Sequence, residues 1–265
     1  MIRPVFANTA WITTRRGLIL RGGGMARVRL KVRVGLIEHP RWGPVLIDAG
    51  YGPQVSQAPG RSLALRIYAR LLRFKINPLE SPLALLADHG YLPDDVRVVL
   101  LTHLHADHIA YLNDLPNATF VIHDHVHGDL RQGVFNELLP ADFAGRCRML
   151  QEHPTQILPF DLGEGFDVLG DGSVLGVPLP GHAPGHYGLC FPGGRPLLYG
   201  ADLQWLCAAV IEGRTPGFPA SWIGEGRART AESVDFAQRF VRGGGDLVLC
   251  HDPTPTAYDW APRYV

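Results

Sequence analysis

The sequence predicts a mixed α/β fold, and three of its stretches carry that prediction. Residues 98–101 form a short apolar run typical of a buried strand, and a helix start is expected just after it, near Asp107. Residues 27–34 alternate between cationic and apolar side chains, which is the pattern of a half-buried strand. From residue 166 onward, short β-type runs separated by Gly, Pro and Asp lead into an expected helix over residues 227–241.

Composition and charge exclude several classes of protein. The 265 residues suffice for one large core or two small domains, and 46% hydrophobic with 19% charged residues is an ordinary globular balance. A net charge of +0 gives no global field that would attract nucleic acid or an anionic membrane. No apolar run is long enough to span a bilayer, and the N-terminus lacks a signal-peptide pattern. The four cysteines show no metal-binding or disulfide spacing, so a soluble protein of the reducing cytoplasm is expected.

Four further elements are expected before residue 98. The cationic positions of the 27–34 strand are interpreted as a solvated, edge-protecting face, in preference to an anion-binding surface. These positions are Arg27, Arg29, Lys31 and Arg33. Residues 36–48 favour a hairpin that ends in Asp48, at a strand end where α/β proteins collect polar groups. An amphipathic helix over residues 63–74 and a short helix over residues 83–89 follow.

The stretch that organises the chain is the sequence T-H-L-H-A-D-H at residues 102–108, directly after the apolar strand. In an extended backbone, His103 and His105 point to the same side, because side chains two residues apart share a face. Asp107 and His108 would lie in the first turn of the next helix, where unpaired N–H groups favour a carboxylate. The segment can therefore serve two adjacent cations, or one cation with three of its four side chains. A histidine-rich surface loop is the less favoured alternative.

Later strand ends carry further polar residues. The expected strand 174–179 is followed by a loop that contains His182, strand 196–199 ends at Asp202, and strand 247–249 ends at His251. A second cluster, His123, His125 and His127, follows strand 118–122, but these residues open an expected helix and are less favoured as metal ligands. Five histidines and two carboxylates suit a pair of divalent cations with a carboxylate between them. No phosphate-binding glycine loop and no serine-nucleophile elbow is present.

The order H-x-H-x-D-H, G-H-x-P-G-H, G-A-D and H-D-P resembles that of the metallo-β-lactamase-fold hydrolases across essentially the whole chain. The resemblance implies a four-layer αββα sandwich, here one domain over residues 1–265 with a helical insert near 51–95 and an excursion near 131–156. It implies Asp48 as a supporting carboxylate and seven metal ligands. One ion would be held by His103, His105 and His182, the other by Asp107, His108 and His251, with Asp202 bridging.

Within the superfamily, the lead-in G-Y-L-P-D-D-V before the histidines and the closing H-D-P are most similar to those of the N-acyl-homoserine lactone lactonases. Two departures concern the substrate. Trp205 stands where the lactonases have a tyrosine that helps to bind the substrate carbonyl, and Ala110-Tyr111 replaces the usual glycine pair. Trp205 and Tyr111 are therefore candidate substrate-binding residues. The walls of the pocket are expected from the 63–74 helix and from Trp205 with Leu206.

The function implied is a dinuclear hydrolase that opens a lactone or related ester by attack of a metal-bridging hydroxide, with Asp107 as the catalytic acid and base. Zinc is the expected metal, with manganese, iron or cobalt as alternatives. The partner is a small-molecule substrate, with no nucleic acid and no membrane, and the oligomeric state is left open. A glyoxalase II-like thioesterase or a phosphodiesterase is the alternative, and a non-catalytic binding protein on the same fold is the second.

Overall fold

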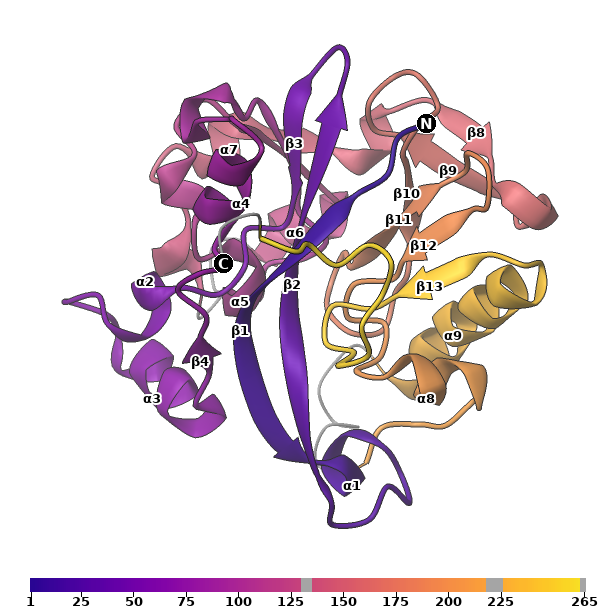
Figure 1. Ribbon diagram of the computed structural model, residues 1–265, viewed down its shortest axis with the longest axis horizontal. Coiled ribbons are helices and arrows are strands. Elements are labelled where there is room, and N and C mark those ends of the chain that lie inside the picture. Colours follow the sequence, from indigo (N-terminus) through magenta and orange to yellow (C-terminus); the bar gives the residue numbers. More distant parts are fainter. Residues whose placement is uncertain (130–134, 218–225, 263–265) are drawn as a thin grey trace. The chain divides into compact units, whose positions relative to one another are not determined.

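The computed structural model describes residues 1–129, 135–217 and 226–262, and Figure 1 shows its course. The chain divides into two compact units. We call the one with residues 3–12, 31–148 and 255–265 the N-terminal unit, and the one with residues 1–2, 13–30 and 149–254 the C-terminal unit. A single domain over residues 1–265 stays a prediction.

A seven-stranded sheet has the order β4-β1-β2-β3-β5-β6-β7. Strands β3, β5 and β6 run parallel, whereas β1 pairs antiparallel with β4 and β2 pairs antiparallel with β3. Both faces of β5 are buried, which explains its uninterrupted apolar run. The strands are β1 (Val5–Arg15), β2 (Arg27–His39), β3 (Gly43–Ile47), β4 (Lys75–Ile76), β5 (Val98–Leu100), β6 (Thr119–Ile122) and β7 (Cys147–Met149).

The expectation of a solvated cationic face on the 27–34 strand is wrong for its second half. Arg33 is fully buried and Lys31 is buried in β2, where both side chains bind Asp259. Lys31 Nζ lies 2.6 Å and Arg33 Nε 2.9 Å from the Asp259 carboxylate. The negative charge of the carboxylate offsets the desolvation cost of burying these two cations. Asp259 comes from the far end of the sequence, so alternation within the strand carried no sign of it.

The six-stranded sheet lies in the C-terminal unit and has the order β13-β12-β11-β10-β9-β8. Helices α8 (Cys207–Ile211) and α9 (Arg227–Arg242) lie beside β13 of this sheet (Figure 1). Ala237 and Phe240 of α9 and Val210 of α8 belong to a core shared with the sheet. The strands are β8 (Thr155–Ile157), β9 (Glu164–Asp167), β10 (Leu175–Pro178), β11 (Tyr187–Phe191), β12 (Leu197–Tyr199) and β13 (Asp246–Val248). The strands and the helix expected from residue 166 onward therefore form, within a few residues of their predicted bounds.

The remaining helices are short. The stretch 51–95, expected as a helical insert, contains α2, α3, β4 and α4, and the excursion near 131–156 contains α7, β7 and β8. Helix α3 ends two residues before the predicted bound, because Arg73 takes a left-handed conformation there. No helix among the described residues is both long and apolar enough to cross a bilayer. These helices are α1 (Arg16–Ile19), α2 (Pro53–Ser56), α3 (Leu63–Leu72), α4 (Pro82–Asp88), α5 (Ala106–Ile109), α6 (Asp124–Asp129) and α7 (Phe143–Arg146).

Candidate metal centre

In the N-terminal unit, two parallel strands bring the first group of site residues to one edge of the sheet. Ile47 at the end of β3 pairs with Leu100 at the end of β5, and the Asp48 N–H donates to the Leu100 carbonyl at 3.0 Å. Parallel neighbours end at the same edge, so the residues that follow them meet. This register places Asp48 beside the T-H-L-H-A-D-H segment.

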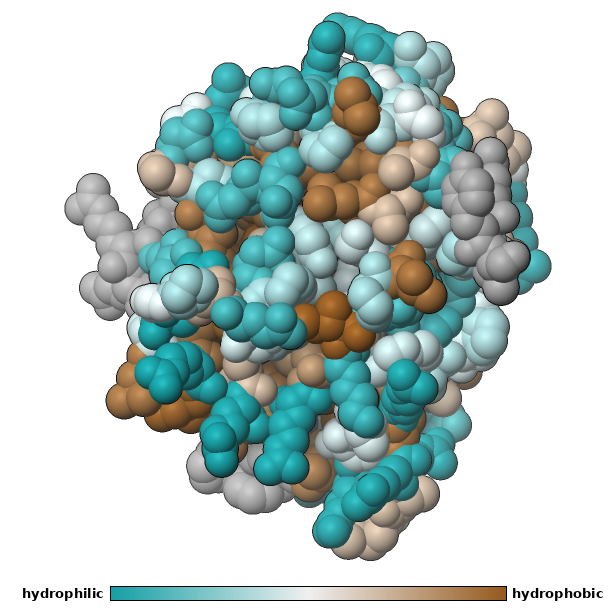
Figure 2. Space-filling view, turned by 60° about the vertical axis from the view of Figure 1, so that its left-hand side comes forward, coloured by the Kyte–Doolittle hydropathy of each residue, from teal (hydrophilic) through white to brown (hydrophobic). Residues whose placement is uncertain are grey.

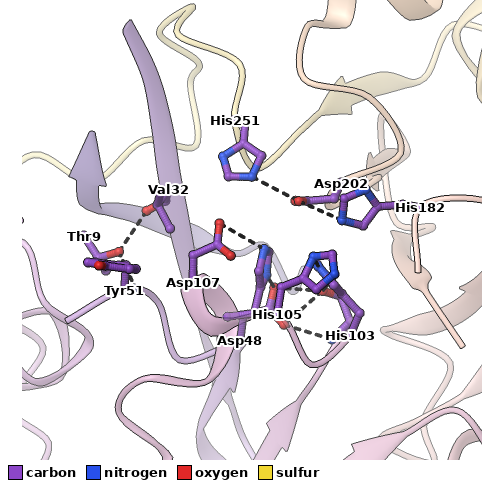
Figure 3. A network of polar contacts seen from close by, with 12 residues as sticks. Thr9, Val32, Asp48, Tyr51, His103, His105, Asp107, His182, Asp202 and His251 are labelled. Atoms are coloured by element: carbon purple, nitrogen blue, oxygen red, sulfur yellow. Dashed lines mark hydrogen bonds and ion pairs between the residues drawn. The ribbon is translucent and has the colours of Figure 1, made fainter. Parts of the chain in front are cut away.

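Asp48 is fully buried and organises that segment through its carboxylate. It accepts hydrogen bonds from the Thr102 N–H at 2.8 Å and from the Thr102 hydroxyl, and it lies 2.8 Å from His108 Nδ1. Figure 3 shows Asp48 below His103 and His105 of this segment. Burial raises the pKa of Asp48, while the charge and hydrogen bond of His108 and the bonds from Thr102 oppose that rise. With Nδ1 bound to Asp48, the Nε2 edge of His108 faces the opposite way, toward Asp107 Oδ2 at 3.9 Å.

The three imidazoles of the segment pack against one another. His103 Nε2 lies 3.0 Å from His105 Nδ1, and the ring centre of His103 is 4.5 Å from that of His105 and 4.1 Å from that of His108. Two nitrogens that each lie about 2.1 Å from one ion stand roughly 3 Å apart, so the first pair already has the spacing of two ligands of a shared cation. Asp107 and His108 sit on α5, as predicted, and both are buried.

The second group of site residues belongs to the C-terminal unit and again follows parallel strands. Tyr199 at the end of β12 pairs with Val248 at the end of β13, and the Cys250 N–H donates to the Ala201 carbonyl at 2.9 Å. Three residues beyond each strand end stand Asp202 and His251, and Asp202 Oδ2 lies 3.0 Å from His251 Nε2. The turn before Asp202 places Ala201 in a left-handed conformation with φ 45°.

His182 completes this group from the loop after β10. Its Nε2 lies 3.3 Å from the same Asp202 oxygen, so one carboxylate atom contacts two imidazoles (Figure 3). The second histidine of the G-H-x-P-G-H motif has a supporting role. His186 Nδ1 contacts the Leu179 carbonyl at 2.7 Å, and its Nε2 accepts the Asp202 N–H at 3.1 Å. His186 thereby ties the loop that carries His182 to the backbone of Asp202.

The chemistry of both groups fits divalent metal ions. Each consists of imidazole nitrogens and carboxylate oxygens, the ligands that zinc, iron, cobalt and manganese accept. His108 also shows the arrangement usual for a ligating histidine, because its other ring nitrogen is held by a carboxylate. Cys250 is buried, as expected, and its thiol lies within 4.8 Å of the ligand atoms of Asp202 and His251.

Two substrate-binding candidates and the second histidine cluster were also named from the sequence. Tyr111 is buried with its ring against Gly52, where an added Cβ would lie 2.5 Å from the ring, and Trp205 is half-buried. Their roles toward a substrate stay predictions. His123 caps helix α6, since its Nδ1 accepts the His125 N–H at 3.2 Å, and Asp124 Oδ1 is 2.8 Å from the same nitrogen. The side chain of His127 lies outside the described residues.

The structure adds residues that the sequence did not single out. Thr102 links Asp48 to His103, because its hydroxyl bonds the carboxylate and lies 3.1 Å from His103 Nδ1. An aromatic cluster continues from His105 through Phe135, Tyr68 and Phe74 to Tyr51. The position of Thr102 between strand and ligands was a usable signal, whereas four aromatic residues scattered over 85 positions of sequence gave none.

Comparisons with known proteins agree with this chemistry. The family model of the metallo-β-lactamase superfamily matches residues 28–229. The N-acyl homoserine lactonase AttM of Azorhizobium caulinodans is 29% identical over 253 residues, which cover 91% of this chain and 90% of that protein. AttM of Rhizobium radiobacter is 28% identical over the same shares.

Solved structures are similar in fold. An N-acyl homoserine lactone hydrolase with N-hexanoyl-L-homoserine at its catalytic metal centre has a TM-score of 0.70 and 17% identity, covering 94% of this chain and 93% of that one. The dizinc quorum-quenching lactonase AidC has a TM-score of 0.63 and 16% identity, covering 100% of this chain and 95% of that one. The expected fold class is confirmed, and the chain belongs to the metallo-β-lactamase superfamily, as one of its metallohydrolases.

Proposed function

We propose that this protein binds two divalent cations and hydrolyses a lactone or a related ester, most like an N-acyl homoserine lactone. The observation that carries the metal assignment is the pair of carboxylate-centred histidine groups, one organised by Asp48 and the other by Asp202. The similarity to the AttM lactonases over nine-tenths of both chains supports the substrate class. The proposed ligands are His103, His105, Asp107, His108, His182, Asp202 and His251.

Zinc is the proposed metal, with manganese, iron or cobalt able to use the same donors. When bound, such cations lower the pKa of water toward 7 and polarise a carbonyl oxygen. The chain's own contribution begins with orientation. Asp48 holds Nδ1 of His108, which leaves Nε2 of that ring available for a metal. The Asp202 carboxylate lies beside Nε2 of both His182 and His251, the position expected of a carboxylate that shares a cation with them.

Asp107 is the proposed catalytic acid and base. Asp107 is buried, with 5% of its surface exposed, and its carboxylate lies 3.9 Å from Nε2 of His108. Ester hydrolysis requires a proton to leave the attacking water and another to reach the leaving oxygen. A carboxylate at the first turn of α5 can take one proton from the attacking water and release it to the leaving oxygen as the ester C–O bond breaks. The ring then opens to a hydroxyl group and a carboxylic acid, which loses the second water proton to solvent and becomes a carboxylate.

The aromatic cluster supports a substrate with an apolar substituent. The Phe135 ring centre is 5.8 Å from that of His105 and 4.9 Å from that of Tyr68, while Tyr51 stacks on Phe74 at 4.2 Å. The 63–74 helix is expected to form part of the pocket wall, and this stays a prediction. Leu63 and Leu71 are exposed, and Tyr68 is the residue of α3 that reaches the cluster beside His105.

Two other functions remain as alternatives. A glyoxalase II-like thioesterase or a phosphodiesterase would use the same ligands, and the similarity to the AttM N-acyl homoserine lactonases favours the lactonase over both. A non-catalytic binding protein is disfavoured because every proposed ligand position is filled. We further propose a cytoplasmic location, in line with four free cysteines.

The test combines metal analysis with a substrate panel. Purified protein loaded with zinc is expected to hold two ions per chain, and to turn over acyl lactones faster than thioesters, phosphodiesters or β-lactams. His108→Ala is expected to lose mainly one ion. His153→Ala, at a half-buried histidine outside both groups, is the matched control and keeps both ions. Folded protein that holds no metal contradicts the metal assignment, while two ions with thioester turnover contradict only the substrate.

A further inference from the structure

Helix α3 is anchored by one side only. Leu65 is fully buried, and Tyr68 contacts Phe74 and Phe135 from the same side of the helix. The Ser62 hydroxyl caps the first turn by accepting the Leu65 N–H at 3.2 Å, and Ser62 is itself bonded to the Glu137 carboxylate. These contacts fix the orientation of the helix. They also determine which of its residues face solvent.

That solvent side carries a stripe of large apolar residues. Leu63, Ile67 and Leu71 are spaced four residues apart, so they line up along one face of the helix. Their exposed fractions are 70%, 48% and 74%. A single exposed leucine is ordinary, but three in register on one helix form a continuous apolar strip. Figure 2 brings forward the side on which α3 lies in Figure 1, and apolar residues there are interspersed with hydrophilic ones.

A cationic stripe runs directly beside the apolar one. Arg66 and Arg70 follow Leu63 and Ile67 by three residues each, which makes them lateral neighbours on the helix. Residues 61–79 hold five cations and no acidic residue, although the whole chain is neutral. Among the described residues, no ion pair involves the exposed side chains of Arg66, Arg70, Arg73 or Lys75.

We propose that the solvent side of α3 docks on the surface of an anionic lipid bilayer. Leucine and isoleucine side chains would enter the boundary between headgroups and acyl chains, and the arginines beside them would contact lipid phosphates. This pairing of an apolar strip with lateral cations, on a helix too short to span a bilayer, is the signature of interfacial helices. Because the whole chain has no net charge, it has no long-range field that would attract a bilayer. The arginines of α3 still form a local positive patch.

Charge argues against the other occupants of this surface. A second copy of the chain, packed about a two-fold axis through α3, would bring one uncompensated arginine stripe against another. Nucleic acid would suit the arginines, but it offers no apolar phase for the exposed leucines, and it usually stacks its bases on aromatic residues. A bilayer with anionic headgroups satisfies both stripes at once.

Vesicle binding tests the proposal without any use of enzymatic activity. The metal-loaded protein is sedimented with phosphatidylcholine vesicles with and without about 30% phosphatidylglycerol, and the anionic vesicles are expected to bind roughly tenfold or more tightly. Added salt is expected to weaken this binding, because it screens the arginines. Arg66→Glu combined with Arg70→Glu, and separately Leu63→Ser combined with Leu71→Ser, are each expected to reduce binding at least about tenfold.

Matched controls use similarly exposed residues elsewhere. Leu92→Ser removes a leucine with 67% exposure, and Arg242→Glu reverses an exposed charge at the end of α9, so both are expected to bind like the parent protein. Unchanged circular dichroism establishes that the variants are folded. Equal binding to neutral and anionic vesicles, or an equal loss in the controls, overturns the proposal. A concentration-dependent dimer that Leu63→Ser with Leu71→Ser makes monomeric also overturns it and assigns the strip to a second copy.

Discussion

Asp48 and His108 lie 60 residues apart in the sequence, yet the Asp48 carboxylate holds His108 Nδ1 at 2.8 Å in a fully buried contact. Because Nδ1 is engaged, the tautomer and the direction of the ring are fixed, and Nε2 is the nitrogen that remains for a metal. Asp48 adopts a left-handed conformation with φ 59°, which asparagine also tolerates.

Asp48→Asn is therefore expected to preserve the turn and the fold but to weaken metal binding by about 10- to 100-fold. The reason is that an amide orients His108 less strongly than a carboxylate does. Competition with a chromophoric chelator measures the change. Thr102→Val removes the hydroxyl contacts with Asp48 and His103 but leaves the contact between Asp48 and His108, and it is expected to have a smaller effect. Equal metal affinity in Asp48→Asn and the parent would show that Asp48 stabilises the fold alone.

Asp107→Asn is expected to lower kcat by about 10²- to 10⁴-fold on the best substrate while KM changes little, because the substitution removes proton transfer rather than binding. Metal content has to be measured in the same preparation, since Asp107 is also a proposed ligand. A variant with two ions and full turnover would exclude Asp107 from the chemistry.

Trp205 is the proposed donor to the substrate carbonyl. Trp205→Phe removes the indole N–H and is expected to lower kcat/KM by about five- to tenfold, which corresponds to one hydrogen bond of about 1 kcal/mol. Trp205→Tyr keeps a donor and is expected to retain most of the activity. If Trp205→Phe matches the parent on the best lactone, the residue serves only as a wall of the pocket.

Asp259→Asn tests how much the ion pairs of Asp259 with the two buried cations of β2 stabilise the fold. The substitution leaves Arg33, which is fully buried, without its anionic partner, and a loss of about 2 to 4 kcal/mol in the free energy of unfolding is expected. Urea denaturation of metal-loaded protein at neutral pH measures it. Glu152→Gln, at an acidic residue outside this cluster, is the control and is expected to change stability by less than about 0.5 kcal/mol.

The difference in unfolding free energy between the parent protein and Asp259→Asn depends on pH, and the direction of this dependence follows from the pKa of Asp259. Burial raises the pKa of Asp259, but hydrogen bonds from Arg33 and Lys31 outweigh it, so the pKa in the folded state is lowered. The stabilisation is therefore present above the unfolded-state pKa of about 3.9 and is lost as the pH falls below it. The gap between parent and Asp259→Asn is expected to narrow in acid. A gap that widens would contradict the assigned interaction.

The sequence predicted those features that local patterns determine. The strand 98–101, the ligand segment after it and the strand ends at Asp202 and His251 are all encoded by neighbouring residues, and the structure has them at the expected places. Features set by distant partners were missed. Lys31 and Arg33 alternate with apolar residues like any solvated face, and only Asp259, more than 220 residues away, explains their burial.

Helix α3 shows the same limit in another way. Its apolar positions include Leu63, Leu65, Ile67 and Leu71, and the sequence does not separate them. In the structure Leu65 is buried, whereas Leu63, Ile67 and Leu71 are exposed. The periodicity of a helix establishes that it has an apolar side. It does not establish which residues of the helix pack against the protein. In α3 that is decided by the contacts of Tyr68 with Phe74 and Phe135, which are distant or irregularly spaced in the sequence.

The ligand groups also differ in when they can form during synthesis. Every residue of the Asp48 group has been synthesised once residue 108 is made, whereas the contact between Asp202 and His251 has to wait for a residue near the end of the chain. Chains begin to fold from the N-terminus while they are being synthesised. The residues of the Asp48 group therefore exist well before His251, and the proposed metal centre is completed only at the last stage of translation.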